Sequence, residues 1–321
     1  MSKAAELAAL IGSQSALSNR NLIINGAMQV AQRGTSFTPS GVTYCLDRFA
    51  HYAASVPSNA VQQSTDVPSS EGFQYSLRMD TVDLRHAVEL PSNGEAGIFY
   101  NGQRLTLSFW AKTGSSTKSA TINLQFIDGA AFGSASSAFS SSNNSIVITD
   151  SWQRFSIQYT VDTTPTASHY ACGFSIGGTA DILYITGVQL EIGEHATPFE
   201  HRSFGDELAR CQRYFEGGTR ANSSHTGNAG AIWTQKNDSS SRSFPQMNAE
   251  YKVFKRATPT VTIESGQDGT ANSISGYSSG TNYTVTSIQS PSPSYVCSYF
   301  QTTGGLPDQI TVGYYTADAE L

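Results

Sequence analysis

The sequence has few charged residues. Asp, Glu, Lys and Arg make up 14% of its 321 residues, against roughly 25% in an ordinary soluble domain. The net charge is −6 and there is no basic run, so we expect no nucleic acid partner. No apolar run is long enough to span a bilayer, and residues 1–11 lack the pattern of a signal peptide. We therefore expect that the protein does not insert into a membrane. We also expect that it is made in a cytoplasm.

Cysteine is also scarce. The four cysteines, Cys45, Cys172, Cys211 and Cys297, are scattered and form no CxxC pair. A zinc site needs closely spaced thiolates or imidazoles, and a disulfide framework is not expected in a long chain made in a reducing compartment. The sequence contains no GxGxxG and no P-loop. We expect buried free thiols, no metal and no cofactor.

The sequence lacks a recognisable catalytic constellation. It has no GxSxG, and its six histidines stand in no triad context. His195 and His201 bracket a turn, where we expect hydrogen bonds that close the corner. Glu191 and Glu194 would serve glycoside hydrolysis only if they faced each other across a cleft, and we expect Glu191 to pair with an arginine or with backbone donors. These observations predict a protein that is not an enzyme.

Aromatic residues and small polar residues are abundant. The chain has 16 Phe, 15 Tyr and 3 Trp, which indicates a folded core. Short segments alternate apolar and polar residues between Gly/Ser/Thr-rich turns, a pattern typical of two packed antiparallel sheets. We expect Trp110 and Trp152 to be core residues. The alternating segments include 22–30, 105–109, 122–126, 155–159, 170–176 and 182–192, and then 229–234, 248–255, 260–264, 282–288, 295–300 and 309–316.

The fold class that this pattern predicts is all-β: a jelly-roll-like antiparallel sandwich plus a second, smaller β domain, with two short helices. We expect the first and last strands of the sandwich, near 22–30 and 182–192, to lie close together. The predicted parts are an N-terminal helix at 1–20, the sandwich at 21–202, a joint helix at 203–215 and the C-terminal β domain at 216–321.

The N-terminal helix has a small apolar face that includes Leu7, Leu10 and Ile11. Three turns of helix with so small a face do not fold alone. Two interpretations stay open, a frayed terminus and a helix that anchors the protein to a partner or to other copies of itself.

The stretch 182–215 joins the two β domains. Ile182, Tyr184, Val188, Leu190 and Ile192 share one side of a period-2 pattern, with Thr186 as its polar member, which predicts a strand with one face in the core. Ser203 begins a helix, with Asp206 at capping-box spacing. The apolar stripe of this helix is Phe204, Leu208, Cys211 and Phe215.

Aromatic side chains of the C-terminal domain are the candidate ligand-binding residues. Sugars present apolar C–H faces that stack on Trp or Tyr, and general binding surfaces use the same residues. Packing within the sheet is the alternative for each of them. The candidates are Trp233, Tyr277, Tyr283, Tyr295 and Tyr299.

Three segments resemble a known family. VQLEIGEHATPFEHRSFGDELARCQRYFE at 188–216 resembles the strand, corner and helix of a family of bacteriophage virion proteins, usually tail-fibre or receptor-binding proteins. NLIINGAMQVAQRGTSF at 21–37, with LDRF at 46–49, resembles the opening of the family's jelly-roll domain, which is like a carbohydrate-binding module. YTADAEL at 315–321 resembles its C-terminal ending. The resemblance implies a virion location and a homotrimer.

Carbohydrate-binding jelly rolls often hold a structural Ca²⁺ through an acidic residue just after this opening turn. Here the corresponding stretch is GAMQ, with Met28 and Gln29, so the expected acid is absent and we expect no calcium.

The sequence therefore indicates a non-catalytic tail fibre or receptor-binding protein, made in the host cytoplasm and carried on the virion. Its expected partners are other virion proteins, its own copies and a host-surface glycan or protein. One alternative is a capsid decoration or head fibre protein. Another is a polysaccharide depolymerase, and a third is a carbohydrate-binding module of a secreted enzyme.

Overall fold

The computed structural model describes residues 19–53, 60–80, 83–90, 99–128, 134–141, 143–163, 169–178, 182–217, 231–236, 242–245, 250–277, 279–303 and 310–320. The chain forms two compact units. One is built from the residues up to 207 except 32–34, and the other from 32–34 and 208–320. Residues 1–18 of the predicted helix at 1–20, including Leu7, Leu10 and Ile11, lie outside the described residues, and Asn19 and Arg20 are not helical. No helix in the described ranges is long and apolar enough to cross a membrane.

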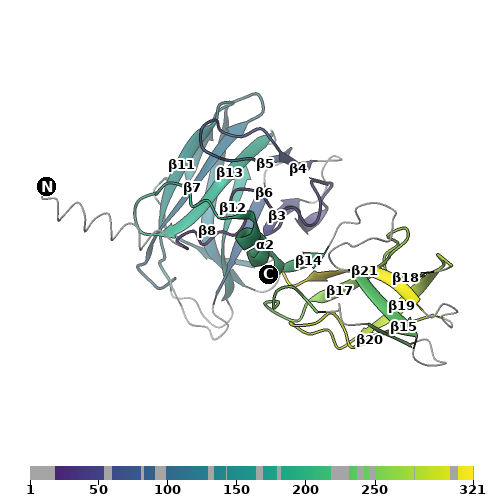
Figure 1. Cartoon of the computed structure of the whole chain (residues 1–321). Coiled ribbons are helices and arrows are strands. Elements are labelled where there is room, and N and C mark those ends of the chain that lie inside the picture. The colour runs from purple at the N-terminus through teal and green to yellow at the C-terminus, as the bar shows by residue number, and fades with distance from the viewer. Residues whose placement is uncertain are drawn as a thin grey trace, which may run out of the picture. The chain divides into compact units, whose positions relative to one another are not determined.

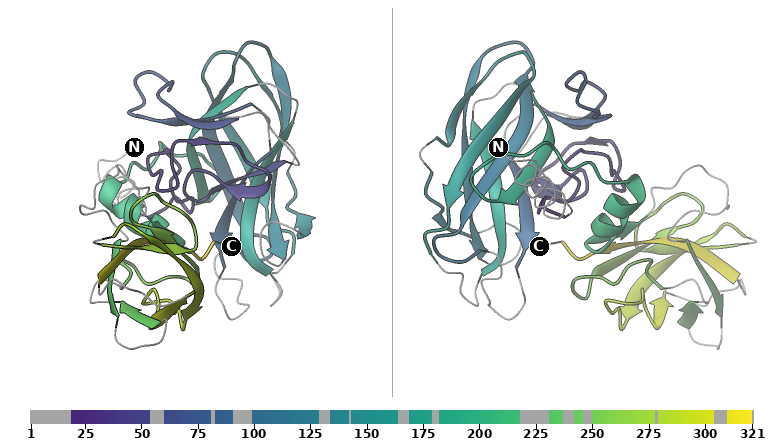
Figure 2. Two further views of the ribbon diagram at one scale, coloured as in Figure 1. Left: turned by 90° about the vertical axis from the view of Figure 1, so that its right-hand side faces the viewer. Right: turned by 60° about the vertical axis from the view of Figure 1, so that its left-hand side comes forward.

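The first unit is an antiparallel sandwich of two sheets, as the sequence predicts (Figures 1 and 2). One sheet has the order β1-β4-β5-β13-β7-β11, and the other has the order β10-β8-β12-β6-β3-β2, with β9 paired to β8. The strands of the first sheet are β1 (Ser36–Phe37), β4 (Val61–Ser64), β5 (Ser76–Met79), β7 (Arg104–Thr113), β11 (Gln153–Thr160) and β13 (Leu183–Ile192). Those of the second are β2 (Gly41–Tyr44), β3 (Phe49–Ala53), β6 (Asp83–Glu89), β8 (Lys118–Asp128), β9 (Ser134–Ala138), β10 (Ser145–Ile148) and β12 (His169–Gly178).

The core of this unit lies between the facing sheets. Alternate residues of each strand point inward, because successive side chains of a strand lie on opposite faces. Tyr159 spans the core and donates a hydrogen bond from its hydroxyl to the carbonyl oxygen of Ile122 at 2.8 Å. Burial raises the pKa of Tyr159 well above its ordinary value, so the hydroxyl stays protonated and remains a donor. Inward-facing residues include Leu77, Leu105, Leu107, Phe109, Ile157, Ile185 and Leu190 of the first sheet, and Phe49, Leu84, Ile122, Leu124, Phe126 and Ile176 of the second.

β13 departs from the single period-2 pattern expected for it. Its register against β7 shifts between Thr186 and Gln189, and Gly187 has a φ of 62°. This β-bulge inserts an extra residue, so the inward-facing residues of β13 switch from odd-numbered to even-numbered positions. Leu183 and Ile185 face the core before the bulge, whereas Val188 and Leu190 do so after it. Tyr184 and Thr186 therefore lie on the face of the sheet away from the core, not on the core face as predicted, and Thr186 is buried there, with its hydroxyl donating to the carbonyl oxygen of Tyr75. Ile192, also predicted to face the core, is 51% exposed at the end of the strand.

The opening segment is predicted to be a strand, but it forms an irregular turn that bonds to β13. The N–H of Leu22 donates to the carbonyl oxygen of Leu190 at 2.9 Å, and the N–H of Val188 donates to the carbonyl oxygen of Gly26 at 2.9 Å. Asn21 adds bonds through its side-chain amide, donating to Val188 and accepting from the N–H of Leu190. The expected proximity of 22–30 and 182–192 is thus confirmed, although side-chain bonds and a turn replace a regular ladder.

The second unit is also antiparallel. β21 (Ile310–Asp318) pairs with β15 at one edge and with β18 at the other, and the path β21-β15-β16-β20-β19-β18 returns to β21, which closes a small barrel. Closure pairs both edges of each strand on this path, while β14 and β17 each pair with β21 outside it. The other strands are β14 (Phe215–Gly217), β15 (Ala231–Lys236), β16 (Arg242–Pro245), β17 (Thr260–Ser265), β18 (Ser273–Gly276), β19 (Asn282–Gln289) and β20 (Tyr299–Thr302). The strand predicted at 248–255 does not form in the described part of that segment, which makes one isolated bridge, between Glu250 and Tyr295.

A buried ion pair lies in the second unit. Lys255 is fully buried and donates from Nζ to Glu216 Oε2 at 2.6 Å and to the carbonyl oxygen of Gln212 at 2.5 Å. The hydroxyl of Tyr315 donates to Glu216 Oε1 at 2.7 Å. Lys255 Nζ also lies 4.6 Å from the ring centroid of Tyr251. Burial lowers the pKa of Lys255, and the hydrogen bond and charge of Glu216 oppose that shift.

The predicted joint helix is α2 (Phe204–Gln212). Ser203 caps it, accepting a hydrogen bond at Oγ from the N–H of Asp206 at 3.2 Å, as the capping-box spacing predicts. Cys211 of its apolar stripe is buried, whereas the ring of Phe204 is 56% exposed. Cys45, Cys211 and Cys297, the cysteines whose side chains the structure describes, are buried thiols outside any disulfide, as expected.

Candidate functional site

Arg202 holds the corner between β13 and α2. Its Nη1 donates to the carbonyl oxygen of Ile23 at 3.1 Å, and its Nη2 donates to Glu200 Oε2 at 3.2 Å. Nη1 also lies 3.5 Å from Glu207 Oε2, and Nη2 donates to the carbonyl oxygen of Asn21. Glu200 Oε2 in turn accepts from the N–H of Asn21 at 2.8 Å. One guanidinium thus ties the opening segment, the corner and the start of the helix together.

The carboxylate of Glu191 is used in the same corner. It accepts from the N–H of Thr197 at 2.9 Å and from the hydroxyl of Thr197 at 2.7 Å. Gln189 donates to it at 3.0 Å, and Arg20 Nε lies 3.7 Å away. The expectation that Glu191 pairs with an arginine or with backbone donors is confirmed, and the structure shows both kinds of partner. Glu194 is an exposed residue, 3.8 Å from Arg104.

The loop 65–75 between β4 and β5 is anchored to the outer face of the first sheet. Asp66 accepts from Trp152 Nε1 at 3.0 Å and from Lys112 Nζ at 2.6 Å. Partial burial opposes ionisation of Asp66, but the hydrogen bonds from Lys112 and Trp152 lower its pKa below the ordinary value. Lys112 Nζ also lies 4.9 Å from the ring centroid of Tyr184. These contacts fix the first part of the loop.

An aromatic cluster fixes the rest of that loop. The ring centroids of Phe73 and Phe199 are 5.1 Å apart, and His201 lies 5.1 Å from Phe73 and 4.9 Å from Phe199. A ring nitrogen of His201 lies 3.0 Å from the carbonyl oxygen of Glu71. The corner at 195–201 is therefore closed partly by histidine contacts, as the sequence predicts for His201. The loop and the corner thus contact each other and form two walls.

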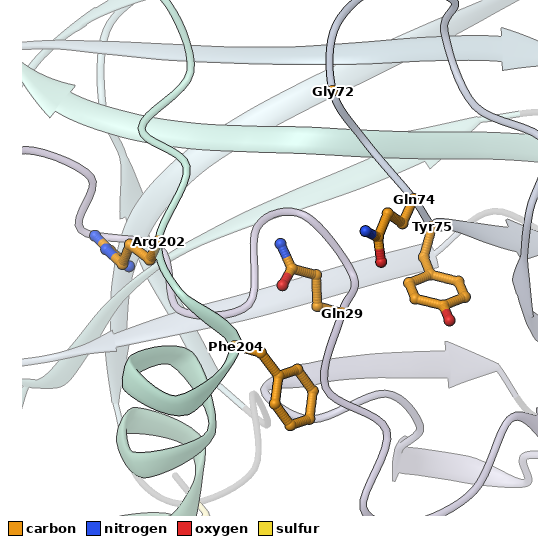
Figure 3. Close-up of a pocket in the computed structure, with 6 residues that line it drawn as sticks. All are labelled: Gln29, Gly72, Gln74, Tyr75, Arg202 and Phe204. Atoms are coloured by element: carbon orange, nitrogen blue, oxygen red, sulfur yellow. The ribbon is translucent and has the colours of Figure 1, made fainter.

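A pocket with a volume of about 430 Å³ lies between these walls. Figure 3 shows that the amides of Gln29 and Gln74 point into the same space, while the rings of Phe204 and Tyr75 lie at its edge. The guanidinium of Arg202 points away from this space, toward the polar cluster of the corner. The lining residues are Gln29, Gly72, Gln74, Tyr75, Arg202 and Phe204.

The lining of this pocket offers hydrogen-bonding groups and aromatic surface. Small-molecule sites of roughly 300–1,000 Å³ combine apolar surface with a few convergent polar groups. A glutamine amide offers two N–H donors and a carbonyl acceptor. Neither Gln29 nor Gln74 has a side-chain hydrogen bond to another residue of the described part of the chain. Two amides and two aromatic rings are therefore available to one ligand.

The pocket does not include the aromatic residues singled out from the sequence. Tyr277 is 50% exposed and Tyr295 is 37% exposed, whereas Tyr283 is 9% exposed and packs in the core of the second unit. Tyr299 begins β20 and is partly buried. Trp233 lies in β15, and its side chain is outside the described part. A ligand role for these five residues stays a prediction.

Sequence patterns do not reveal the four residues that give the pocket its chemistry. Gln29, Gln74 and Tyr75 stand in irregular segments, where no periodicity signals a shared site. The spacing of Phe204 assigns it to the packing stripe of the helix. One signal is present: the capping position of Ser203 places Phe204 at the first helical residue, where a side chain can point beyond the helix.

The described residues contain no group of three or more His, Cys, Asp or Glu side chains that are placed to hold a metal ion.

No protein-family model matches the sequence, and no curated protein matches it. Among solved structures, the CBM22-1 xylan-binding domain from Paenibacillus barcinonensis Xyn10C is similar, with 11% identity and a TM-score of 0.34 over 55% of this chain and 96% of that one. TmCBM61 in complex with β-1,4-galactotriose is similar, with 18% identity and a TM-score of 0.29 over 55% of this chain and 100% of that one. The enzymatically active domain of tailspike protein 4 of bacteriophage CBA120 has 15% identity and a TM-score of 0.32, over 54% of this chain and 22% of that one.

Proposed function

We propose that this protein is a non-catalytic virion attachment protein of a bacteriophage, a tail fibre or receptor-binding protein whose first unit binds a host-surface glycan in the pocket. The observation that carries the proposal is the pair of available amides, Gln29 and Gln74, beside the rings of Tyr75 and Phe204. Hydroxyl groups of a sugar both donate and accept, which matches the amides, and its C–H faces match the rings.

The location of the pocket also supports the virion assignment. Its walls include residues of 21–37 and 188–216, the two segments that resemble phage tail-fibre and receptor-binding proteins. Arg202 joins these two segments directly through the carbonyl oxygen of Ile23. Each site offers few polar groups, so we expect weak binding per copy. Several copies on one particle, such as the expected homotrimer, would raise the effective affinity without stronger individual contacts.

Binding is favoured over hydrolysis by the positions of the nearby acids. A glycosidase needs two carboxyl groups on either side of the scissile bond. Here Glu200 and Glu207 are engaged by Arg202, and neither of the two carboxylates belongs to a lining residue. Glu191 is 3% exposed and engaged by Thr197. A polysaccharide depolymerase remains the second candidate class, because the resembling family is defined by fold and virion context and not by a chemistry.

The proposal is tested by measuring adsorption of the phage to host cells. Purified protein should bind host cells and block adsorption of the phage, and the double variant Gln29→Ala/Gln74→Ala should lose most of both effects. Binding without release of reducing ends from host polysaccharide supports the non-catalytic assignment, and release of reducing ends would replace it with the depolymerase.

The control is a pair of substitutions of the same type away from the pocket. Gln153→Ala and Gln158→Ala on β11 change exposed glutamines, and both effects should persist in that variant. Equal loss in both double variants would contradict the pocket assignment. Cryo-EM of intact particles distinguishes a tail location from a capsid decoration or head fibre.

A further inference from the structure

The charges around the pocket define the class of sugar that it can accept. Among the described residues that line the pocket, Arg202 alone carries a charge, and its side chain is 6% exposed. Its guanidinium faces the carboxylates of both Glu200 and Glu207, so two negative charges surround one positive charge. Both Nη groups of Arg202 are engaged, whereas its Nε is buried and has no hydrogen-bond partner among the described residues. Separating the guanidinium from its two carboxylates inside the protein is costly, so its charge is not readily offered to a ligand.

The other charged groups near the pocket do not reverse this balance. Glu71 precedes the lining residue Gly72 and is exposed, and Asp206 is exposed in the first turn of α2. The N-terminal end of α2 carries a partial positive charge, which Asp206 and Glu207 offset. His201 is a nearby titratable group that would add a positive charge when protonated, and its ring nitrogen lies against the carbonyl oxygen of Glu71.

We propose that the pocket selects an uncharged sugar unit, such as a neutral hexose or pentose, over a uronic or sialic acid, because its donors are the amides of Gln29 and Gln74 and the cation of its lining is committed to two carboxylates. This inference rests on the proposed function and adds the ligand class. A ligand carboxylate would only accept hydrogen bonds, which would leave the amide carbonyls unsatisfied, and it would be placed near a net negative charge.

The test uses matched sugars. Lactose and galacto-oligosaccharides form the neutral set, and 3′-sialyllactose and galacturono-oligosaccharides form the acidic set. They are displayed on one array with a broad panel of bacterial glycans, each present with and without carboxyl groups. The full-length protein is applied at pH 8, where histidine side chains are ordinarily neutral. We expect each neutral sugar that binds to exceed its acidic counterpart by about tenfold or more.

Charge-introducing variants make the test specific to the pocket. Gln74→Lys and Gln29→Lys each place a cation among the lining residues and should shift the preference toward the acidic member of a pair. Ser156→Lys adds the same charge at an exposed position of β11, three strands away from β5 in the sheet, and should leave the preference unchanged.

The outcomes separate the two proposals. Binding to acidic sugars alone, lost in Gln29→Ala/Gln74→Ala, would overturn the neutral-sugar inference and leave glycan attachment standing. An array with no bound glycan would overturn the inference and the glycan-binding part of the proposed function together. Neutral binding that is lost in Gln29→Ala/Gln74→Ala and redirected by Gln74→Lys would support both.

Discussion

Gly26 and Val188 approach each other so closely that only glycine fits at position 26. The N–H of Val188 donates to the carbonyl oxygen of Gly26 at 2.9 Å. A Cβ atom added to Gly26 would lie 2.1 Å from the carbonyl oxygen of Val188, which is a backbone atom that cannot rotate away. The turn at Asn25-Gly26 is therefore a docking point for β13 and needs the absence of a side chain.

We predict that Gly26→Ala destabilises the first unit by about 3 kcal/mol or more, because the opening segment must leave β13 to relieve the overlap. Urea denaturation of the full-length protein measures the loss. Gly205→Ala is the matched control. A Cβ atom added to Gly205 would have no atom within 4 Å, so α2 should be unchanged or stabilised by up to about 1 kcal/mol. A Gly26→Ala protein within about 0.5 kcal/mol of wild type would contradict the docking role, since surface substitutions lie within that range.

The fold class can be predicted from the sequence because the buried residues of a strand recur at every second position. The alternation of Leu105, Leu107 and Phe109 places β7, and the same pattern also puts Trp110 on the opposite face. Trp110 is only partly buried there, and so is Trp152, whose indole bonds to Asp66. The expectation that both lie in the core follows from the usual burial of large aromatics and is wrong for both. The alternation alone places Trp110 correctly.

Sequence patterns do not predict the bulge in β13 or the pocket. The bulge at Gly187 adds one residue to β13 without changing its composition. The alternation of apolar residues in the sequence therefore looks continuous, although the residues before the bulge lie on the opposite face from the one that the alternation predicts. The pocket joins Gln29, Gln74 and Phe204 from three segments far apart in the chain. The proximity of these three residues depends on how the loops are anchored, and the periodicity of the sequence carries no information about that. The polar corner is partly predictable, since Glu191 has the kind of partners that its place in the sequence suggests.

Asp66 gives the loop 65–75 a pH-dependent anchor. Its pKa is lowered in the folded chain, so ionisation is more favourable there than in the unfolded chain. The resulting stabilisation is complete above the ordinary carboxyl pKa of about 4 and is lost as the pH falls through the lower folded-state pKa. We predict that the difference in Tm between wild type and Asp66→Asn is largest near pH 7 and shrinks below about pH 4. Calorimetry over a series from about pH 7 to about pH 3 measures it, with Asp150→Asn, at an exposed position, as the control for loss of one negative charge. A difference that does not vary with pH would contradict the anchor.

The buried pair of Lys255 and Glu216 makes a different prediction for the second unit. Lys255→Ala leaves the Glu216 carboxylate buried without its cation, so we expect a loss of about 3–5 kcal/mol. Lys252→Ala changes an exposed lysine three residues away and should alter stability by less than about 0.5 kcal/mol. The double variant Lys255→Met/Glu216→Gln removes both charges and should be more stable than Lys255→Ala. Urea denaturation measures all three, and a double variant less stable than Lys255→Ala would show that the cost does not come from an uncompensated charge.

The exposed ring of Phe204 tests the pocket without disturbing the fold. A phenyl side chain that is 56% exposed contributes little to folding, so Phe204→Ala should have a Tm close to that of wild type. If the ring stacks on a sugar face, its removal should weaken glycan binding by about three- to tenfold. Phe254→Ala is the matched control, because Phe254 is 63% exposed in the second unit and is not a lining residue. Titration of one array-positive glycan into both variants by calorimetry compares them directly. Equal affinities would remove Phe204 from the site, whereas a loss confined to Phe254→Ala would move ligand binding to the second unit, where the tyrosines predicted from the sequence lie.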